Sequence, residues 1–236
     1  VMPRNLQEAD VLHFSPSHHF PSGLVTPVSR RMELLAWARE GKWIIEDDYD
    51  SEFRFDAHPK PAMMSLDAQG RVIYMNTFSK SLAPSIRISY MVLPPELMAV
   101  FRKNLGFYSC TVSSFEQYTL ARFLDQGHFE KHINRMRKYY KNRRNQVVSA
   151  LNNCAFAQKL TIREEDAGLH FLLKVDTPMT DEELVRFCEA KGVRLRALSS
   201  YYHLPIPQED QRCLVINYAG VNQQDLEDIL ASWGNA

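Results

Sequence analysis

Residues 74–87 read Tyr-Met-Asn-Thr-Phe-Ser-Lys-Ser-Leu-Ala-Pro-Ser-Ile-Arg and place a single lysine, Lys80, just after an apolar strand. An amine that is partly desolvated and lies near a second cation, here Arg87, loses its proton more readily, as imine formation with an aldehyde requires. Thr77, Ser79 and Arg87 offer hydrogen-bond donors for a phosphate group. The alternative interpretation of Lys80 is a solvated loop cation.

A second stretch, residues 43–53, reads Trp-Ile-Ile-Glu-Asp-Asp-Tyr-Asp-Ser-Glu-Phe. Because strand side chains alternate, we expect Asp47 and Tyr49 to share a face and Asp48 to point away. A carboxylate and a phenol side by side can hold a protonated pyridine nitrogen and the hydroxyl of the same ring, and the carboxylate keeps that nitrogen charged. An acidic turn facing water is the alternative, but it leaves unexplained why the acids directly follow two isoleucines.

The order Asp47-x-Tyr49, Ser79-Lys80 and Arg87 resembles the pyridoxal phosphate site of fold-type I aminotransferases. That resemblance implies an α/β fold: part of a large domain with a mostly parallel sheet, followed by a small α+β domain. It also implies that Lys80 forms an internal aldimine with pyridoxal 5'-phosphate.

Three longer stretches, residues 15–23, 45–53 and 77–84, resemble a narrower branch, the MocR/GabR family of bacterial transcription regulators. In that family a winged helix-turn-helix precedes an aminotransferase-like effector domain. The resemblance runs from about Val11 to the C-terminus. It implies a small amino-acid or amine effector, a homodimer, and DNA contact only through an N-terminal domain that these residues do not contain.

The expected domains are residues 1–125 as the C-terminal part of the cofactor-binding domain, 126–155 as a long linking helix, and 156–236 as the small domain. In the first domain, strands over 11–14, 43–45, 72–75 and 88–93 are predicted. Parallel strands joined by a helix open their pockets at their carboxyl ends, where Phe20, Asp47 with Tyr49, and Lys80 would follow. The proline-punctuated residues 54–67 are expected to be free of helix.

Helix boundaries are predicted from caps and glycines. Thr26 as cap and Pro27 in the first turn indicate a helix ending at Gly41, and its apolar stripe comprises Val28, Met32, Leu35, Trp37 and Ala38. The next helices follow Pro94-Pro95 and a Ser114 cap with Gln117. The long linking helix is expected to bury one face and to present a basic face to solvent. The inward residues are Ile133, Met136, Tyr140, Val147 and Leu151, and the basic ones are Arg135, Arg137, Lys138, Lys141, Arg143 and Arg144.

The last 80 or so residues predict a compact α+β unit. Its expected strands are 169–175, 193–197 and 213–218. Thr180 with Glu183 forms a capping box for a helix ending at Gly192, and a final helix runs from Asn222 to about Trp233.

Two departures from aminotransferases bear on function. Phe20 stands where the resemblance implies an asparagine touching the cofactor's 3-hydroxyl, so Tyr49 would make that contact alone. A ligand carboxylate needs an arginine of the small domain, but Val215 occupies the usual strand position. Arg196 and Arg212 are the nearby candidates and Arg194 a weaker one; each is also explained as a surface residue.

Composition limits the class of protein. The 28 basic and 28 acidic residues balance, which argues against a nucleic-acid surface spread over these residues. Four separated cysteines are expected to be reduced core residues of a cytoplasmic protein. No apolar run reaches the ~20 residues of a membrane span. His13, His18 and His19 lack accompanying acids or cysteines at ligand spacing, so no metal site is expected.

Three functional hypotheses remain. The first is a ligand-sensing domain that changes closure when an amino compound binds. The second is a working aminotransferase in which Lys80 moves the substrate proton. The third is a piece too incomplete to hold cofactor, consistent with a chain that begins at Val1 and contains no glycine-bearing phosphate loop before Val11.

Overall fold

The protein was studied as a computed structural model that describes residues 6, 8–39, 41–55, 60–166, 168–221, 226, 230 and 231. The chain divides into two compact units. The first comprises Val1–His19, Val25–Glu52 and His58–Met136, and the second comprises Phe20–Leu24, Phe53–Ala57 and Arg137–Ala236. Within the described ranges, no helix is both long and apolar enough to span a membrane.

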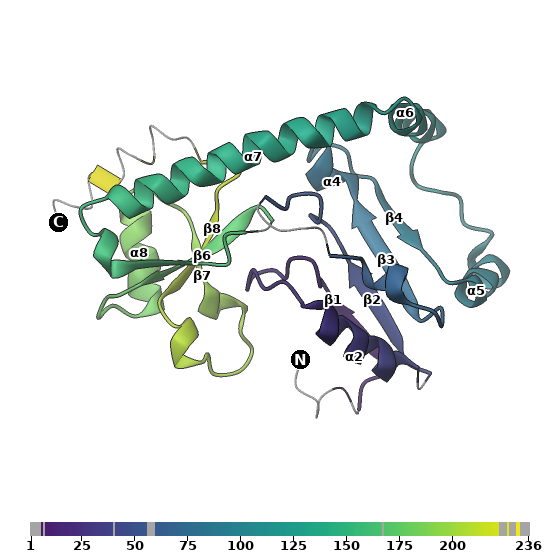
Figure 1. The fold of residues 1–236 in the computed structure, drawn as a ribbon, viewed down its shortest axis with the longest axis horizontal. Coiled ribbons are helices and arrows are strands. Elements are labelled where there is room, and N and C mark those ends of the chain that lie inside the picture. Colours follow the sequence, from purple (N-terminus) through teal and green to yellow (C-terminus); the bar gives the residue numbers. More distant parts are fainter. Residues whose placement is uncertain are drawn as a thin grey trace. The chain divides into compact units, whose positions relative to one another are not determined.

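The first unit is built on a four-stranded sheet in the order β1-β2-β3-β4 (Figure 1). Strands β1 (Val11–Phe14), β2 (Trp43–Asp47) and β3 (Val72–Thr77) are parallel, whereas β4 (Ser89–Val92) is antiparallel to β3. Helix α2 (Val28–Ala38) connects β1 to β2 and packs Leu34 near Ile44 in the core. This is the expected strand-helix-strand unit.

The start and the buried face of α2 differ from the prediction. Pro27, not Thr26, is the N-cap residue, and no side chain caps the helix. Val28 and Met32 are 39% and 44% exposed, whereas Arg31 is fully buried. The guanidinium of Arg31 can occupy the inward face because its donors reach backbone carbonyls. Those carbonyls belong to Pro16, Thr26 and Pro61.

A short helix, α3 (Met63–Leu66), lies in the segment that was expected to contain none. Met63 is fully buried. The Glu46 carboxylate accepts hydrogen bonds from the backbone N–H groups of Met63 and Met64, at 2.7 and 2.9 Å. A carboxylate at the first turn satisfies donors that a helix start leaves open, which explains why a helix forms despite the preceding prolines.

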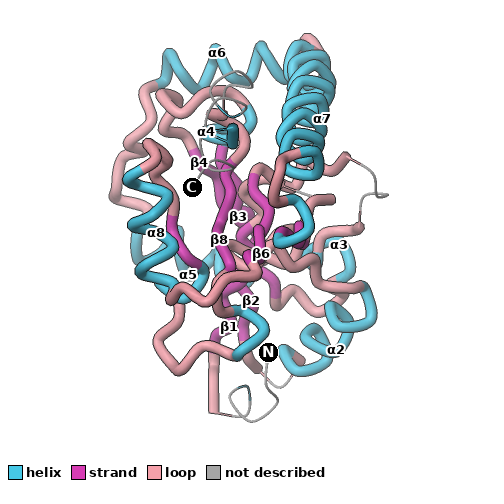
Figure 2. Tube along the Cα trace, turned by 90° about the vertical axis from the view of Figure 1, so that its left-hand side faces the viewer, coloured by secondary structure: helices cyan, strands magenta, loops and turns pink. Residues whose placement is uncertain are grey.

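Within the first unit, the chain beyond β3 is mostly helical. One helical turn, α4 (Phe78–Ser81), directly continues β3 (Figure 2), and α5 (Pro95–Leu105) and α6 (Ser114–Asp125) follow β4. The cap of α6 is Ser113, whose Oγ accepts from the Glu116 N–H, so the predicted pair of Ser114 and Gln117 was wrong by one residue. Neither α5 nor α6 contains a buried residue.

The long helix α7 (His128–Asn153) is present as predicted. Its predicted inward residues Ile133, Val147 and Leu151 are buried. Arg144 was expected on the solvated basic face but is only 6% exposed, and its guanidinium lies 5.4 Å from the centroid of the Phe55 ring. Arginine stacks well on aromatic faces because its planar cation is weakly hydrated.

The second unit contains an antiparallel sheet in the order β5-β6-β8-β7, the part of α7 from Arg137 onward, and helix α8 (Asp181–Ala190). The strands are β5 (Leu160–Arg163), β6 (His170–Val175), β7 (Arg196–Ala197) and β8 (Cys213–Asn217), and the 3-10 turns are Ala157–Lys159, Leu198–Tyr201 and Gln208–Asp210. The capping box of Thr180 and Glu183 is confirmed. Strand β5 was not predicted, β7 is shorter than expected, and the predicted helix from Asn222 lies outside the described residues.

The cysteines are free, as expected, but do not all lie in a core. Cys188 and Cys213 are buried, and burial raises the pKa of each thiol to about 11. Cys154 is half-buried, whereas Cys110 is exposed. The expectation of a core position was therefore wrong for Cys110.

Candidate functional site

Strand pairing places Asp47 and Lys80 at the same end of the first sheet, where the parallel strands β2 and β3 finish. Asp47, the last residue of β2, pairs with Met75 in the parallel strand β3. Strand β3 ends two residues later and passes into α4, which carries Lys80. The acid and the amine thus follow the carboxyl ends of adjacent parallel strands, where pockets of such sheets form.

The Lys80 side chain is open to solvent. The residue is exposed, although the neighbouring Ser81 on the same turn is buried. Among the described residues Lys80 has no recorded hydrogen-bond or ion-pair partner. Its amine is therefore available to an external ligand.

Asp47 contacts a residue of β1, and Tyr49 contacts the chain that follows β1. The Asp47 Oδ2 lies 3.4 Å from Nε2 of His13. The Tyr49 hydroxyl donates to the carbonyl of His18 at 3.1 Å. Burial, together with the Asp50 and Asp47 carboxylates, raises the pKa of Tyr49. The phenol therefore stays protonated and acts as a donor.

Asp48 faces a different group from Asp47, in keeping with strand alternation. It is 6% exposed and accepts a hydrogen bond from the Tyr74 hydroxyl at 2.8 Å. The amide of Asn76 in turn donates to the Tyr74 oxygen at 3.1 Å. Burial and the nearby Asp48 raise the pKa of Tyr74. These side chains form a buried network that supports the ends of β2 and β3.

The three predicted phosphate-binding residues do lie together. Thr77 caps α4, because its Oγ1 accepts from the Ser79 N–H at 3.2 Å and also donates to the Ile88 carbonyl. The Ser79 hydroxyl donates to the Ile86 carbonyl at 2.7 Å and accepts from Nη1 of Arg87 at 3.3 Å. The hydroxyl protons of Thr77 and Ser79 are thus used within the protein. Arg87 is exposed and retains further N–H donors.

Sequence reasoning missed a group of buried titratable side chains next to these residues. A hydrogen bond of 2.8 Å joins Nδ1 of His18 and Oδ2 of Asp50. Glu46 and Glu52 both have raised pKa values, caused first by burial and also by the Asp48 carboxylate; that of Glu52 is about 7. The run of acids in residues 46–52 was the available signal, because so many carboxylates need partners.

Three other predicted residues belong to the second unit. The Phe20 ring lies edge-on to the rings of His170 and Tyr201, each with a centroid separation of 5.2 Å. Arg196 is exposed at the start of β7. Arg212 has a left-handed backbone (φ 53°), and its N–H donates to Asp181 at 2.5 Å.

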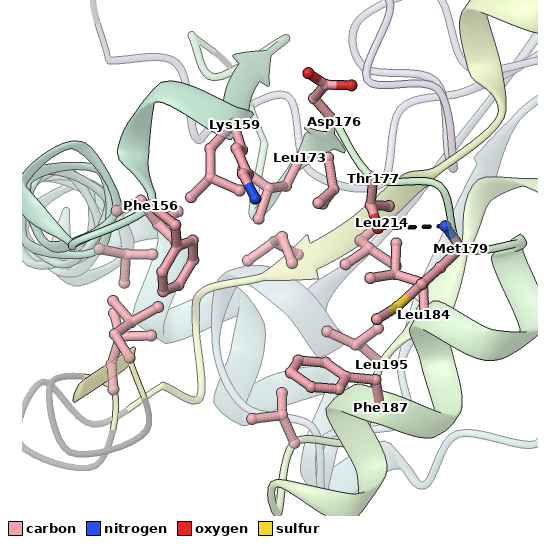
Figure 3. Close-up of a pocket in the computed structure, with 18 of the residues that line it drawn as sticks. Phe156, Lys159, Leu173, Asp176, Thr177, Met179, Leu184, Phe187, Leu195 and Leu214 are labelled. Carbon is pink, nitrogen blue, oxygen red and sulfur yellow. Dashed lines mark hydrogen bonds between the residues drawn. The ribbon is translucent and has the colours of Figure 1, made fainter. Parts of the chain in front are cut away.

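The second unit contains an apolar pocket of about 690 Å³ between α7, α8 and the sheet (Figure 3). Leu173, Leu184 and Leu214 line it, with Lys159 and Asp176 among the few charged residues. The Thr177 Oγ1 accepts from the Met179 N–H at 3.3 Å. Because the lining is largely the hydrophobic core of this unit, the pocket lacks a set of convergent polar groups typical of a catalytic site.

The first unit has a groove of about 530 Å³ that does not include Lys80, Asp47, Tyr49 or Arg87. It lies between the residues of β4 and those of α6, and its walls are mostly apolar. Thr77, one of the predicted phosphate-binding residues, lines this groove, so the groove adjoins the strand-end site around Lys80.

The sequence matches the family model described as "Aminotransferase class I and II" over residues 4–232. The uncharacterized HTH-type transcriptional regulator YhdI of Bacillus subtilis is 41% identical over 229 residues, which make up 96% of this chain and 48% of the regulator. The probable rhizopine catabolism regulatory protein MocR of Rhizobium meliloti is 38% identical over 231 residues, 96% of this chain and 45% of that protein. The chain thus spans about half the length of these curated relatives.

Solved structures show the same fold. The kynurenine aminotransferase of Pyrococcus horikoshii, in a complex with PMP, KYN and KYA, superimposes with a TM-score of 0.81 at 27% identity. The match covers 98% of this chain and 58% of that one. The predicted fold-type I architecture and the predicted resemblance to MocR-type regulators are both confirmed.

Proposed function

Because the chain belongs to the class I and II aminotransferase family, we propose that it is the effector-binding part of a bacterial transcription regulator. In this proposal it holds pyridoxal 5'-phosphate at Lys80 and recognises a small amino acid or amine. The whole regulator would be a cytoplasmic dimer that contacts DNA through another domain. The similarity to helix-turn-helix regulators supports this role over a free-standing enzyme.

The residues at the carboxyl ends of β2 and β3 are the main support for the proposal, because their functional groups match those of the cofactor. An exposed amine at Lys80, a carboxylate at Asp47 and a phenol at Tyr49 suit the aldehyde, the ring nitrogen and the ring hydroxyl. Arg87 suits the phosphate, with Ser79 beside it. For the Ser79 hydroxyl to donate to the phosphate as well, it must turn away from the Ile86 carbonyl. Thr77 mainly stabilises the start of α4.

When bound, the cofactor supplies an aldehyde that condenses with primary amines and a ring that takes up electron density. The residues of the chain have separate tasks. Asp47, oriented by its contact with His13, keeps a ring nitrogen protonated, and Tyr49 donates a hydrogen bond while its raised pKa keeps it neutral. Lys80 would supply the primary amine that holds the cofactor's aldehyde, and the amine of an effector would compete for the same aldehyde.

Cofactor binding is tested by reconstitution. We expect the purified chain, mixed with pyridoxal 5'-phosphate and dialysed, to keep visible absorbance, and we expect Lys80→Ala to lose it. Lys103→Ala is the matched control, because Lys103 is an exposed lysine on α5 of the same unit. A colourless wild-type chain would contradict the proposal and favour a piece too incomplete to hold cofactor.

A working aminotransferase is the second candidate, favoured by the likeness to the kynurenine aminotransferase. It predicts sustained keto-acid production from an amino donor and a keto acceptor. A sensor predicts at most one turnover per bound cofactor. Continued turnover would therefore replace sensing with catalysis as the function of the site.

A further inference from the structure

Lys80 lies on a helix of one turn, α4, whose neighbouring side chains differ in exposure. Ser81, the next residue, is 1% exposed, whereas Lys80 is exposed. Successive residues of a helix point about 100° apart, so burial of the Ser81 side chain directs the Lys80 side chain toward solvent. A rotation of this turn would therefore move the Lys80 amine relative to the carboxyl ends of β2 and β3.

A single turn of helix is not stable by itself, because helix nucleation is unfavourable. In α4 the Leu82 N–H donates to the Phe78 carbonyl at 2.8 Å, and Thr77 caps the start. The last carbonyl groups of a helix have no partner inside it. The turn that carries Lys80 therefore depends on contacts from elsewhere in the chain.

Helix α7 begins beside α4 (Figure 1) and supplies such contacts. The Nε2 of His132 lies 3.0 Å from the carbonyl oxygen of Ser81. Because a carbonyl only accepts, Nε2 carries the proton and donates it. Phe129, three residues earlier on the same face of α7, packs its ring edge-on against the ring of Phe78, with 5.8 Å between centroids. Helix α7 thus contacts the first and the last residue of α4, within the first unit.

We propose that His132 is a positioning residue for Lys80, whose amine it orients by holding the carbonyl of Ser81. The inference rests on the proposed function, in which the Lys80 nitrogen joins an aldehyde carbon and one water is released. Without the Nε2 donor, the Ser81 carbonyl loses its partner and the α4 turn gains freedom to rotate or unwind. Misplacing a reacting group by about 1 Å can slow a reaction by about 100-fold, so a loosened turn should bind the cofactor more slowly.

The test compares three variants with the wild type. His132→Leu removes the donor, and His132→Gln restores an N–H donor at a similar reach. Asn134→Leu, at an exposed position of α7, is the matched control. Visible absorbance after addition of pyridoxal 5'-phosphate follows binding at Lys80. We expect His132→Leu to bind roughly tenfold more slowly, and the other two variants to bind at close to the wild-type rate.

A second measurement needs no cofactor. Amide hydrogen exchange of the Leu82 N–H, followed by NMR in the unloaded chain, reports on local opening of the α4 turn. This exchange should be faster in His132→Leu and normal in His132→Gln, whereas exchange in β2 and β3 should be unchanged in both. A purely structural role would instead speed exchange in β2 and β3 as well, because the whole unit would lose stability.

Three results would overturn the inference: a wild-type binding rate in His132→Leu, faster exchange that extends to β2 and β3, or failure of His132→Gln to restore the rate. A wild-type chain that binds no cofactor would contradict the proposed function instead. In that case exchange at Leu82 would still decide whether His132 holds the turn. Circular dichroism of each variant shows whether the chain is folded.

Discussion

His18 and Asp50 form a hydrogen bond almost completely removed from water, with side chains 1% and 3% exposed. Weakening a buried hydrogen bond so that a polar group loses its partner costs about 1–3 kcal/mol. We therefore expect Asp50→Asn to lower the free energy of unfolding of the first unit by about 2 kcal/mol. Urea denaturation followed by circular dichroism measures this change.

The control for that variant is Glu33→Gln. Glu33 pairs with Arg30 on the surface of α2, and its side chain is 60% exposed. Exposed pairs contribute about 0–1 kcal/mol, so this variant should be close to the wild type. If both substitutions lowered the free energy of unfolding equally, the burial of His18 and Asp50 would not explain their contribution to stability.

Glu52 gives a pH dependence whose sign follows from its raised pKa. The carboxyl holds its proton up to about pH 7 when folded, mainly because it is buried, and loses it near 4.5 when unfolded. The folded state thus binds more protons between these values, so stability falls as the pH rises through 7. The shift corresponds to a loss of roughly 2–3 kcal/mol between pH 4.5 and pH 8.

Glu52→Gln should remove this loss, because an amide does not ionise. We expect the variant to gain stability relative to the wild type at pH 8 and to match it near pH 4.5, as measured by thermal unfolding across that range. Glu182→Gln, at an exposed position of α8, should keep the wild-type pH profile. A Glu52→Gln profile with the wild-type slope would contradict the assignment.

At the residue scale, the sequence was informative about local chemistry and silent about burial. Alternation along β2 predicted that Asp47 and Asp48 face different groups, and they contact His13 and Tyr74 respectively. It did not reveal that Arg31 is buried, because its carbonyl partners lie up to 30 residues away in the chain. Partners that distant are fixed by the tertiary fold and leave no local pattern.

Helix caps allow the same comparison at the level of elements. The box formed by Thr180 and Glu183 was predictable because both of its hydrogen bonds join residues three positions apart. At α6, Ser114 was predicted as the cap, but the structure uses the adjacent Ser113. At α2, Arg31 takes the Thr26 carbonyl and Pro27 becomes the cap. Local signals suffice where no distant group competes.

The loss of a helix cap should lower the free energy of unfolding only as far as the helix itself is packed into a core. Helix α8 buries Leu184 and Cys188, so we expect Thr180→Ala to cost about 1 kcal/mol of unfolding free energy. Helix α6 buries no residue, so Ser113→Ala should fray that helix and leave global unfolding nearly unchanged. Thermal unfolding and amide exchange at α6 separate the two outcomes. Equal loss of global stability would show that α6 is packed more firmly than its exposure indicates.

At the scale of the whole molecule, the order of strands and helices was predictable from the sequence. The unit to which two short segments belong was not. Residues Phe20–Leu24 and Phe53–Ala57 belong to the second unit, although the chain on both sides of each belongs to the first. The Gly168 N–H donates to the Phe53 carbonyl at 2.8 Å, a contact between residues more than 100 positions apart. The predicted division at 125 and 155 assumed continuous segments and stays a prediction.

The two units have separate hydrophobic cores, and this leads to a prediction for the entire chain. Leu34, 1% exposed, belongs to the core of the first unit, and Leu184, 5% exposed, belongs to the core of the second. Replacing a buried leucine with alanine costs about 2–5 kcal/mol. Local stability is set within cooperative units, so we expect Leu34→Ala to speed amide exchange in β2 and β3 and to leave β6 and β8 unchanged. Leu184→Ala should do the reverse.

Native-state hydrogen exchange with mass spectrometry reads both units in one experiment, so each variant serves as a control for the other. Leu204→Ala, at a 79% exposed position, should change neither pattern. Because α7 runs through the boundary between Met136 and Arg137, its amides report whether unfolding of one unit spreads along the helix. If either core variant accelerated exchange equally in all four strands, the two units would unfold as one, and the separate cores would not act as separate cooperative units.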